Sequence, residues 1–249
     1  MRICDFEKRF TCENRLTVYN MIDKALRGDP GIRSGVFAMK ESRTDGNRNR
    51  QLELMLAPAR ERLMGRSAAQ LCANAGVTQD GNGDILLPSL GEIIRVPTTD
   101  YVISQPLDMW RHLTLLQYLD TADGTPLAGR EIALAEMPGG LSRGSGFDKD
   151  ISLMFARAFA EATAEDVERA CKTLGGEFIP DKADVAAVIP YAPRFPVTVR
   201  FWQGDEEFPP SGKASVDANA VHYLTLEAAG GACSAVVQAI IRALKQTGC

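Results

Sequence analysis

Apolar residues recur at helical spacing in several segments of this chain. The spacing predicts helices over 13–26, 51–64, 67–76 and 110–119, two helices within 147–173, and two helical pieces within 222–245. Pro58 is expected to kink or divide the second helix, and Gly230 with Gly231 is expected to separate the last two pieces. Ser67 and Thr163 are suitable N-cap residues for the helices that follow them.

Shorter apolar runs between turn signals predict β-strands. These runs occupy 85–88, 91–96, 184–189 and 196–202. The turn between Pro88 and Gly91 is expected to join the first two strands as a hairpin. In the last run Val197, Val199 and Phe201 alternate with polar residues, which indicates one buried face. Because helices and strands mix without the regular alternation of a dinucleotide-binding fold, the sequence predicts an α+β fold with a mixed or antiparallel sheet and packed helices.

Charge is unevenly distributed along the chain. Residues 1–66 contain 14 Lys and Arg against 9 Asp and Glu, whereas residues 67–249 contain 14 against 23. This division predicts a basic, mainly helical N-terminal extension over 1–66 and an α+β domain over 67–249. The basic stretch 40–50 has no aromatic residue for base stacking and no dense Lys/Arg run, so we expect a solvated polar loop there and no nucleic-acid partner.

The composition is that of a soluble globular protein, with 45% apolar and 24% charged residues and no apolar run long enough to cross a bilayer. The first nine residues carry charge where a secretory signal needs an uninterrupted apolar segment. The six cysteines include no Cys-x-x-Cys spacing, so reduced thiols are expected. We therefore expect a cytoplasmic protein with no membrane partner.

The densest group of chemically capable side chains lies between residues 204 and 223. It consists of Asp205, Glu206, Glu207, Asp217, Asn219 and His222. Carboxylate, amide and imidazole groups suit divalent-metal binding or acid–base chemistry. The metal ligands that we hypothesise are Asp205, Glu207, Asp217 and His222. Asn219 and His222 are three residues apart and share a face if that segment is helical.

The local geometry of this acidic segment limits which side chains can act together. Residues alternate faces along an extended strand, so either Asp205 and Glu207 or Glu206 alone can point into one site. A short loop is expected to join 204–210 to 217–223. The alternative interpretation is an exposed turn after a strand, in which Phe208 packs as an anchor and the carboxylates cap neighbouring backbone groups.

Three further candidates lie outside the acidic segment. His112 is either a core histidine bonded to backbone or a ligand to a corrinoid cobalt or haem iron. Gly139 and Gly140, together with the glycines at 144 and 146, either cradle an anion with their backbone amides or form a flexible connection. Cys233 follows two glycines at an expected helix start, where a thiolate would be stabilised.

Several segments together resemble a known family. They are Leu90-Gly91-Glu92, His112-Leu113 to Tyr118-Leu119, Gly124-Thr-Pro126-Leu-Ala-Gly129, Glu136-Met-Pro138-Gly139-Gly140, Phe201-Trp202-Gln-Gly204-Asp205-Glu206-Glu207-Phe208-Pro209 and Val216-Asp217-Ala-Asn-Ala-Val-His222-Tyr223-Leu224. The Gly-Asp-Glu-Glu-Phe-Pro stretch is the most specific of them. From about Ser67 to the C-terminus, the chain resembles the bacterial and archaeal family named domain of unknown function 3786.

The resemblance implies a link to anaerobic corrinoid or one-carbon metabolism, and no particular activity. Some members carry a four-cysteine iron–sulfur module like that of corrinoid iron–sulfur proteins. This chain has no iron–sulfur motif, because it lacks four closely spaced cysteines. The resemblance therefore implies a separate corrinoid or iron–sulfur protein as partner. A corrinoid and a divalent metal are alternative cofactors.

Two hypotheses for the function follow. The first is a ligand-binding or accessory protein linked to anaerobic corrinoid or one-carbon metabolism. The resemblance supports it, as does the absence of a nucleophile elbow, a phosphate loop, a His-Glu-x-x-His motif and a Rossmann fingerprint from the sequence. The second is a metal-dependent hydrolase or lyase that uses the acidic segment with His222. We favour the first hypothesis.

Overall fold

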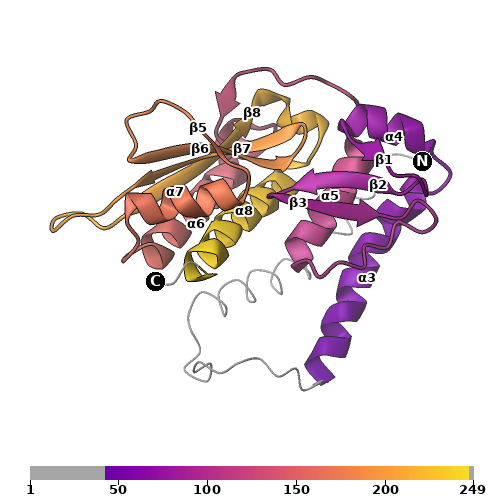
Figure 1. Ribbon diagram of the computed structural model, residues 1–249, viewed down its shortest axis with the longest axis horizontal. Coiled ribbons are helices and arrows are strands. Elements are labelled where there is room, and N and C mark those ends of the chain that lie inside the picture. Colours follow the sequence, from indigo (N-terminus) through magenta and orange to yellow (C-terminus); the bar gives the residue numbers. More distant parts are fainter. Residues whose placement is uncertain (1–42, 247–249) are drawn as a thin grey trace. The chain divides into compact units, whose positions relative to one another are not determined.

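The computed structural model describes residues 43–246 of the 249-residue chain (Figure 1). In chain order its elements are α3 (Arg43–Leu63), α4 (Ala68–Ala75), β1 (Thr78–Gln79), β2 (Ile85–Ser89), β3 (Glu92–Val96), α5 (Met109–Thr121), β4 (Glu131–Ile132), η1 (Leu134–Glu136), α6 (Gly140–Ala158), α7 (Ala164–Thr173), β5 (Glu177–Phe178), β6 (Val185–Ala192), β7 (Phe195–Trp202), β8 (Ser211–Asp217), η2 (Ala218–His222) and α8 (Leu226–Gln246). The α+β prediction is confirmed, and both sheets are antiparallel. The helix predicted over 13–26 lies outside the described residues. Among the helices that are described, none has the length and apolar character needed to cross a membrane.

The three-stranded sheet, in the order β1-β2-β3, contains the predicted hairpin. Its turn is formed by Leu90 and Gly91, whose φ angles of 52° and 77° are positive. A Cβ atom on Gly91 would lie 2.6 Å from the Thr173 carbonyl oxygen, so this turn requires glycine. Leu90 is buried, and its N–H donates to the Pro190 carbonyl oxygen at 3.0 Å. The tip of the hairpin is thereby anchored on strand β6 of the second sheet.

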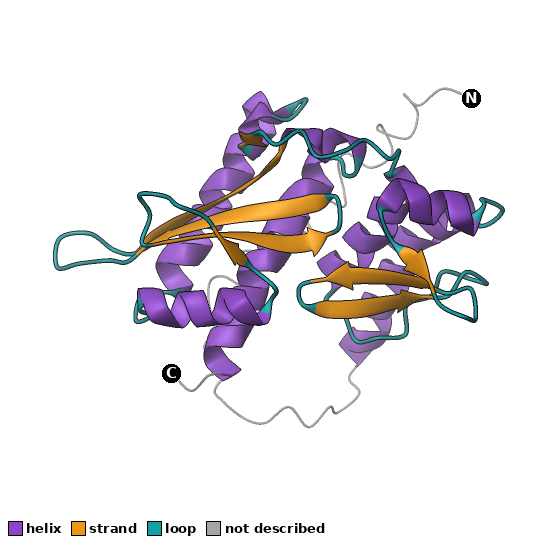
Figure 2. Ribbon diagram, turned by 45° about the horizontal axis from the view of Figure 1, so that its top comes forward, coloured by secondary structure: helices purple, strands orange, loops and turns teal. Residues whose placement is uncertain are grey.

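The five-stranded sheet has the order β4-β8-β7-β6-β5, and Figure 2 shows it as a group of strands separate from the smaller sheet. Helices α6, α7 and α8 pack against it. Val197 and Phe201 of β7 are buried, as their alternation predicts. Arg200 is only partly buried and forms ion pairs with Glu131 and with Asp181, the latter at 2.8 Å between Nε and Oδ2. One face of the sheet is therefore apolar, and the other carries paired charges.

Strand β8 replaces the loop that we expected between the acidic segment and His222. Its buried residues include Gly212 and Ala214, which are too small to give a clear apolar alternation with the buried Val216. A Cβ atom on Gly212 would lie 2.4 Å from the Phe155 ring, so glycine lets helix α6 approach the strand closely. Pairing with β7 over residues 211–216 and packing against α6 therefore define this strand.

Helix α8 is a single helix, and the predicted division at Gly230 and Gly231 is wrong. A Cβ atom on Gly230 would lie 2.7 Å from the Phe147 ring, and one on Gly231 would lie 3.0 Å from Trp110. Both glycines therefore serve close packing of α8 against α5 and α6. Burial of the helix on these sides offsets the low helix propensity of glycine.

Helix α3 contributes to the hydrophobic core. Leu56 and Leu63 are completely buried and belong to the same core as residues of α5 and of both sheets. The helix is not divided at Pro58. The polar loop expected over 40–50 is wrong from Arg43 onward, because α3 begins there in a stretch without apolar periodicity. The division of the chain after residue 66 stays a prediction.

Candidate functional site

His222 is positioned by the short helix η2, which directly follows strand β8. The Asp217 side chain caps this helix, since its Oδ1 accepts the N–H of Asn219 at 2.9 Å. The same carboxylate accepts the N–H groups of Ala128 and Gly129, each at 2.8 Å. Asp217 thus fixes η2 and the loop before β4 with both of its oxygens. Its position indicates a structural role for this carboxylate.

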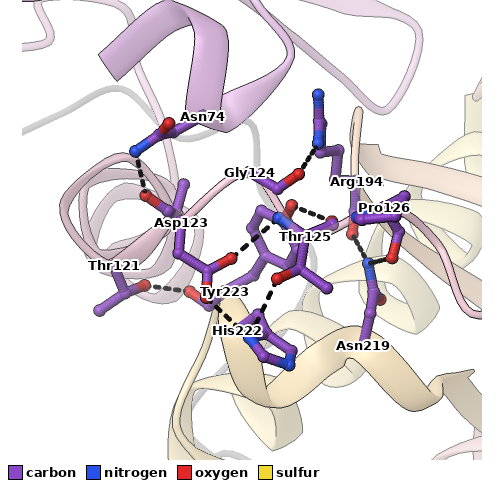
Figure 3. Close-up of polar contacts among 11 residues, drawn as sticks. Asn74, Thr121, Asp123, Gly124, Thr125, Pro126, Arg194, Asn219, His222 and Tyr223 are labelled. Atoms are coloured by element: carbon purple, nitrogen blue, oxygen red, sulfur yellow. Dashed lines mark hydrogen bonds and ion pairs between the residues drawn. The ribbon is translucent and has the colours of Figure 1, made fainter. Parts of the chain in front are cut away.

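The partner of His222 comes from the loop after helix α5. Asp123 Oδ2 lies 2.7 Å from His222 Nδ1, and Thr125 Oγ1 lies 3.2 Å from the same nitrogen (Figure 3). The N–H of Thr125 donates to Asp123 Oδ1 at 2.9 Å. Hydrogen bonds from the backbone N–H and hydroxyl of Thr125, followed by the bond from His222, lower the pKa of Asp123 to about 2. Asp123 is therefore an ionised acceptor, so His222 Nδ1 donates the proton in this pair.

The surroundings of this pair hold the two segments together. Tyr223 donates its hydroxyl to the Thr125 carbonyl oxygen, and Thr121 donates its hydroxyl to the Tyr223 carbonyl oxygen (Figure 3). Asn219 Nδ2 donates to the carbonyl oxygens of Pro126 and Arg194, at 3.3 Å and 3.4 Å. Asn219 is 3% exposed, and its Oδ1 has no hydrogen-bond partner within residues 43–246. The network locks the loop after α5 onto η2.

The residues joined by this network form a region that we call the corner at His222: Thr121, Asp123, Thr125, Asn219, His222 and Tyr223. Its chemical capability comes from the half-exposed Asp123–His222 pair. The two side chains are 49% and 41% exposed. Because Nδ1 donates to the carboxylate, Nε2 of the neutral ring carries a lone pair that can accept a proton. An imidazole oriented by a carboxylate is a general arrangement for acid–base catalysis.

The acidic segment, residues 203–210, forms the loop between β7 and β8, and we call it the acidic loop. Asp205 Oδ1 accepts the N–H groups of Glu207 and Phe208, at 2.9 Å and 2.7 Å. The Asp205 N–H donates back to the Phe208 carbonyl oxygen at 2.9 Å. Glu206 and Glu207 are exposed, and Phe208 is 67% exposed. The alternative of a turn capped by a carboxylate agrees with this geometry, but the expected packing of Phe208 is wrong.

The hypothesised metal ligands do not share one location. Asp205 and Glu207 precede strand β8, whereas Asp217 is its last residue and His222 follows it. A seven-residue strand at about 3.3 Å per residue separates the two pairs by roughly 20 Å. Within residues 43–246, no three His, Cys, Asp or Glu side chains are grouped so that they could hold a metal ion. The structure instead joins His222 to Asp123 and Thr125.

Comparison with known proteins identifies the family of the chain. Residues 67–239 match the family model described as domain of unknown function (DUF3786). The chain belongs to this family. Neither the curated proteins nor the solved structures contain a match. The corner at His222 and the acidic loop both lie inside the DUF3786 domain.

His112 lies within the same domain, on helix α5. It is 8% exposed, and its Nε2 has no hydrogen-bond partner among the described residues. Burial, with a further contribution from Arg60, lowers its pKa. The charged Arg60 and Glu53 act on this ring electrostatically, and such surroundings do not suit the roomy apolar cavity that a corrinoid or haem needs.

Gly139 and Gly140 belong to the start of helix α6. Gly139 is the N-cap residue with a φ of 77°, and a Cβ atom on Gly140 would lie 2.4 Å from the Leu134 carbonyl oxygen. These glycines therefore permit a tight junction between η1 and α6. A surface hollow of about 570 Å³ lies beside them and is also lined by Glu136, whose carboxylate opposes anion binding. The expected flexible connection over 139–146 is wrong, because these residues begin a helix.

The described cysteines are unsuited to metal or nucleophilic chemistry. Cys233 is completely buried inside α8 rather than at a helix start, and burial raises its pKa. The predicted stabilised thiolate is therefore wrong. Cys72 and Cys171 are also buried, and burial raises the pKa of Cys171 to about 12. Cys72, Cys171 and Cys233 do not fit an iron–sulfur cluster, since they form no ligand group.

Sequence reasoning missed Asp123 and Thr125. We interpreted 120–124 only as the turn that ends a helix. The Asp-x-Thr spacing is a local signal for a turn in which the carboxylate accepts a backbone N–H two residues later. It carries no information about His222, which is 99 residues further along the chain.

Proposed function

We propose that this protein is an accessory protein that binds a protein partner through the acidic loop. The observation that carries this proposal is an exposed phenylalanine on a loop that is already ordered. Asp205 fixes the turn by accepting two backbone N–H groups. A Cβ atom on Gly204 would lie 2.6 Å from the Pro210 backbone nitrogen, so the two ends of the loop are closely packed. Phe208 is displayed on this fixed turn.

Such a loop suits protein recognition for two physical reasons. An aromatic side chain on an ordered turn loses little conformational entropy when it enters a pocket, and buried aromatic residues often dominate binding energy. Glu206 and Glu207 make no ion pair within the described residues and stay exposed beside it. Their charges favour a partner with basic residues around an apolar pocket.

The class of partner rests on the family resemblance. A corrinoid or iron–sulfur protein of anaerobic one-carbon metabolism is the partner that the resemblance implies. The described cysteines Cys72, Cys171 and Cys233 are buried and form no ligand group for a cluster, and the charged Arg60 and Glu53 near His112 do not suit a corrinoid. In this proposal, any such cofactor belongs to the partner.

The test compares Phe208→Ala with Phe178→Ala. Phe178 is also an exposed phenylalanine, at 39%, but lies on edge strand β5. A partner that binds the wild-type protein should bind the Phe178→Ala variant with the same affinity. Its affinity for the Phe208→Ala variant should be at least about tenfold lower. Replacing both Glu206 and Glu207 with Gln should reduce the salt dependence of binding. Equal binding of the two phenylalanine variants would contradict the proposal.

A second candidate function, acid–base catalysis at His222, is favoured by the Asp123–His222 hydrogen bond of 2.7 Å. In this role Asp123 orients the ring, and His222 Nε2 takes up a proton from a water or substrate group. A hydrolase or lyase reaction uses such a step. His222→Gln and Asp123→Asn should both abolish turnover in a screen of ester, phosphoester and elimination substrates, whereas Phe208→Ala should retain it. Turnover that survives His222→Gln would exclude this mechanism.

A further inference from the structure

Arg60 of helix α3 presents unused hydrogen-bond donors in a buried position. The residue is 9% exposed, and its Nη1 donates to Glu53 Oε2 at 2.6 Å. Its Nε and Nη2 are buried without a hydrogen-bond partner in the described part of the chain. These two nitrogens form one edge of the guanidinium group, and this edge matches two oxygens of a carboxylate or phosphate. Buried donors without partners are rare in folded proteins.

His112 supplies a third unused polar atom in the same region. Its Nε2 is also buried without a partner among the residues described. The electrostatic influence of Arg60 and Glu53 on His112 shows that the three groups lie near one another, across helices α3 and α5. Glu53 is 59% exposed, so the Glu53–Arg60 pair extends from the buried site to the surface.

We propose that Arg60 and His112 bind the carboxylate or phosphate group of a small anionic ligand. Two ligand oxygens accept the Nε–H and Nη2–H of Arg60, and one oxygen accepts the Nε2–H of His112. An anion is the matching chemistry, because the guanidinium edge offers donors and no acceptor. Glu53 occupies only Nη1 and leaves this edge available. The site is independent of the acidic loop and of His222.

The two histidines of the chain make a direct experiment possible. Their ring resonances are followed by NMR in ¹⁵N-histidine-labelled full-length protein while inorganic phosphate or acetate is added at constant ionic strength. A bound anion should shift the His112 ring resonances in a saturable manner and raise the pKa of His112. Saturation with phosphate alone indicates a phosphate ligand, and saturation with acetate indicates a carboxylate ligand. His222 serves as the internal control and should shift little.

Two variants test the geometry in opposite directions. Arg60→Gln should weaken anion binding at least about tenfold, since it removes charge-assisted hydrogen bonds. Glu53→Gln should strengthen binding several-fold because it removes a repelling carboxylate, and a damaged fold would not produce this gain. Arg62→Gln is the matched control, as Arg62 is half exposed and its Nε pairs with Asp120 at 2.7 Å.

Three results would overturn the proposal. The first is a His112 spectrum that neither anion changes, and the second is an equal response of His112 and His222. The third is a Glu53→Gln variant that binds the anion no more tightly than the wild-type protein.

Discussion

The two histidines of this protein occupy opposite environments. His222 is partly exposed, and its Nδ1 donates to an ionised carboxylate. His112 is buried near Arg60, and its Nε2 has no partner in the described residues. Most polar groups of the corner at His222 have partners, with Asn219 Oδ1 as the exception, whereas Arg60 and His112 on α3 and α5 present three buried nitrogens that lack partners among the described residues.

This difference indicates how each region can serve a function. Polar groups that already have partners hold a local geometry, and at the corner they orient the half-exposed His222 ring so that its Nε2 stays available. Buried groups without partners destabilise the fold until a ligand or water satisfies them. The first region is therefore organised for orientation of one side chain, and the second is organised for binding.

Leu56→Ala tests whether helix α3 really encloses the His112 region. Leu56 is completely buried, so its truncation should reduce the free energy of unfolding by about 2–5 kcal/mol. Leu54→Ala on the same helix is the control, and its 68% exposed side chain should change stability by less than about 0.5 kcal/mol. Urea denaturation followed by circular dichroism measures both values. Similar small effects would mean that α3 is a separate extension, as a division after residue 66 implies.

Tyr118→Phe tests whether polar contacts stabilise the corner at His222. The Tyr118 hydroxyl donates to the Ala75 carbonyl oxygen at 2.6 Å and accepts the Arg194 N–H at 3.0 Å. The Tyr118 ring also stacks on Tyr223, with 5.3 Å between ring centroids. Removal of the hydroxyl leaves both backbone groups without this hydrogen-bond partner. The free energy of unfolding, measured by thermal or urea denaturation, should fall by about 1–3 kcal/mol.

Tyr191→Phe provides the matched comparison for this prediction. Its buried hydroxyl contacts the Thr114 side chain rather than backbone groups, so the same deletion should cost less. A larger loss for Tyr191→Phe would show that the network around Tyr118 contributes little.

Much of the fold could be predicted from periodicity and capping residues. The hairpin at Leu90, strand β7 and the N-cap at Thr163 were all predicted from local patterns. Strand β8 and the unbroken helix α8 were not, because glycine and alanine occupy several of their buried positions, including Gly212, Gly230 and Gly231. A small residue is required at such a position because a large side chain from another element packs on it, as Phe155 packs on Gly212. The neighbouring residues in the sequence do not reveal this contact.

The candidate site was predictable only in part. His222 was predicted from its residue type, but its true partner was not, because chain topology brings Asp123 to it. The acidic loop contains the stretch that is most specific to the family resemblance. Its proximity in sequence to His222 suggested a shared metal site, but strand β8 separates the hypothesised ligands. Arg60 gave no signal, because its significance depends on burial beside His112.

The pH dependence of stability distinguishes the two histidines. The pKa of His112 is lowered from 6.5 in the folded protein, so the unfolded chain binds its proton first as the pH falls. The stability that neutral His112 contributes is present above pH 6.5 and is lost as the pH falls from there through the lower folded-state pKa. His112→Gln should remove this part of the slope, which begins near pH 6.5 and continues toward lower pH. His222→Gln should retain it.

Urea titrations in Bis-Tris chloride measure this slope without a competing carboxylate or phosphate. Addition of phosphate should flatten the slope in the wild-type protein, if the anion raises the pKa of His112 as proposed. An identical slope in His112→Gln and the wild-type protein would assign the pH dependence to other groups.

Asp123→Asn should produce the smallest effect, in a different pH range. The pKa of Asp123 is lowered from 3.8 to about 2, so its contribution to stability is present above pH 3.8 and is lost as the pH falls toward 2. The side chain is 49% exposed and therefore screened by solvent, which limits this contribution to less than about 1 kcal/mol. In the Asp123→Asn variant, the stability measured by acid unfolding should lack the decrease that Asp123 contributes over this pH range. Asp100→Asn is the control, since Asp100 accepts the Val102 N–H at 2.9 Å in a similar turn but has no histidine partner in the described structure. Equal acid profiles for all three proteins would show that the Asp123–His222 bond is too weak to organise the corner, and that result would also remove the basis for catalysis at His222.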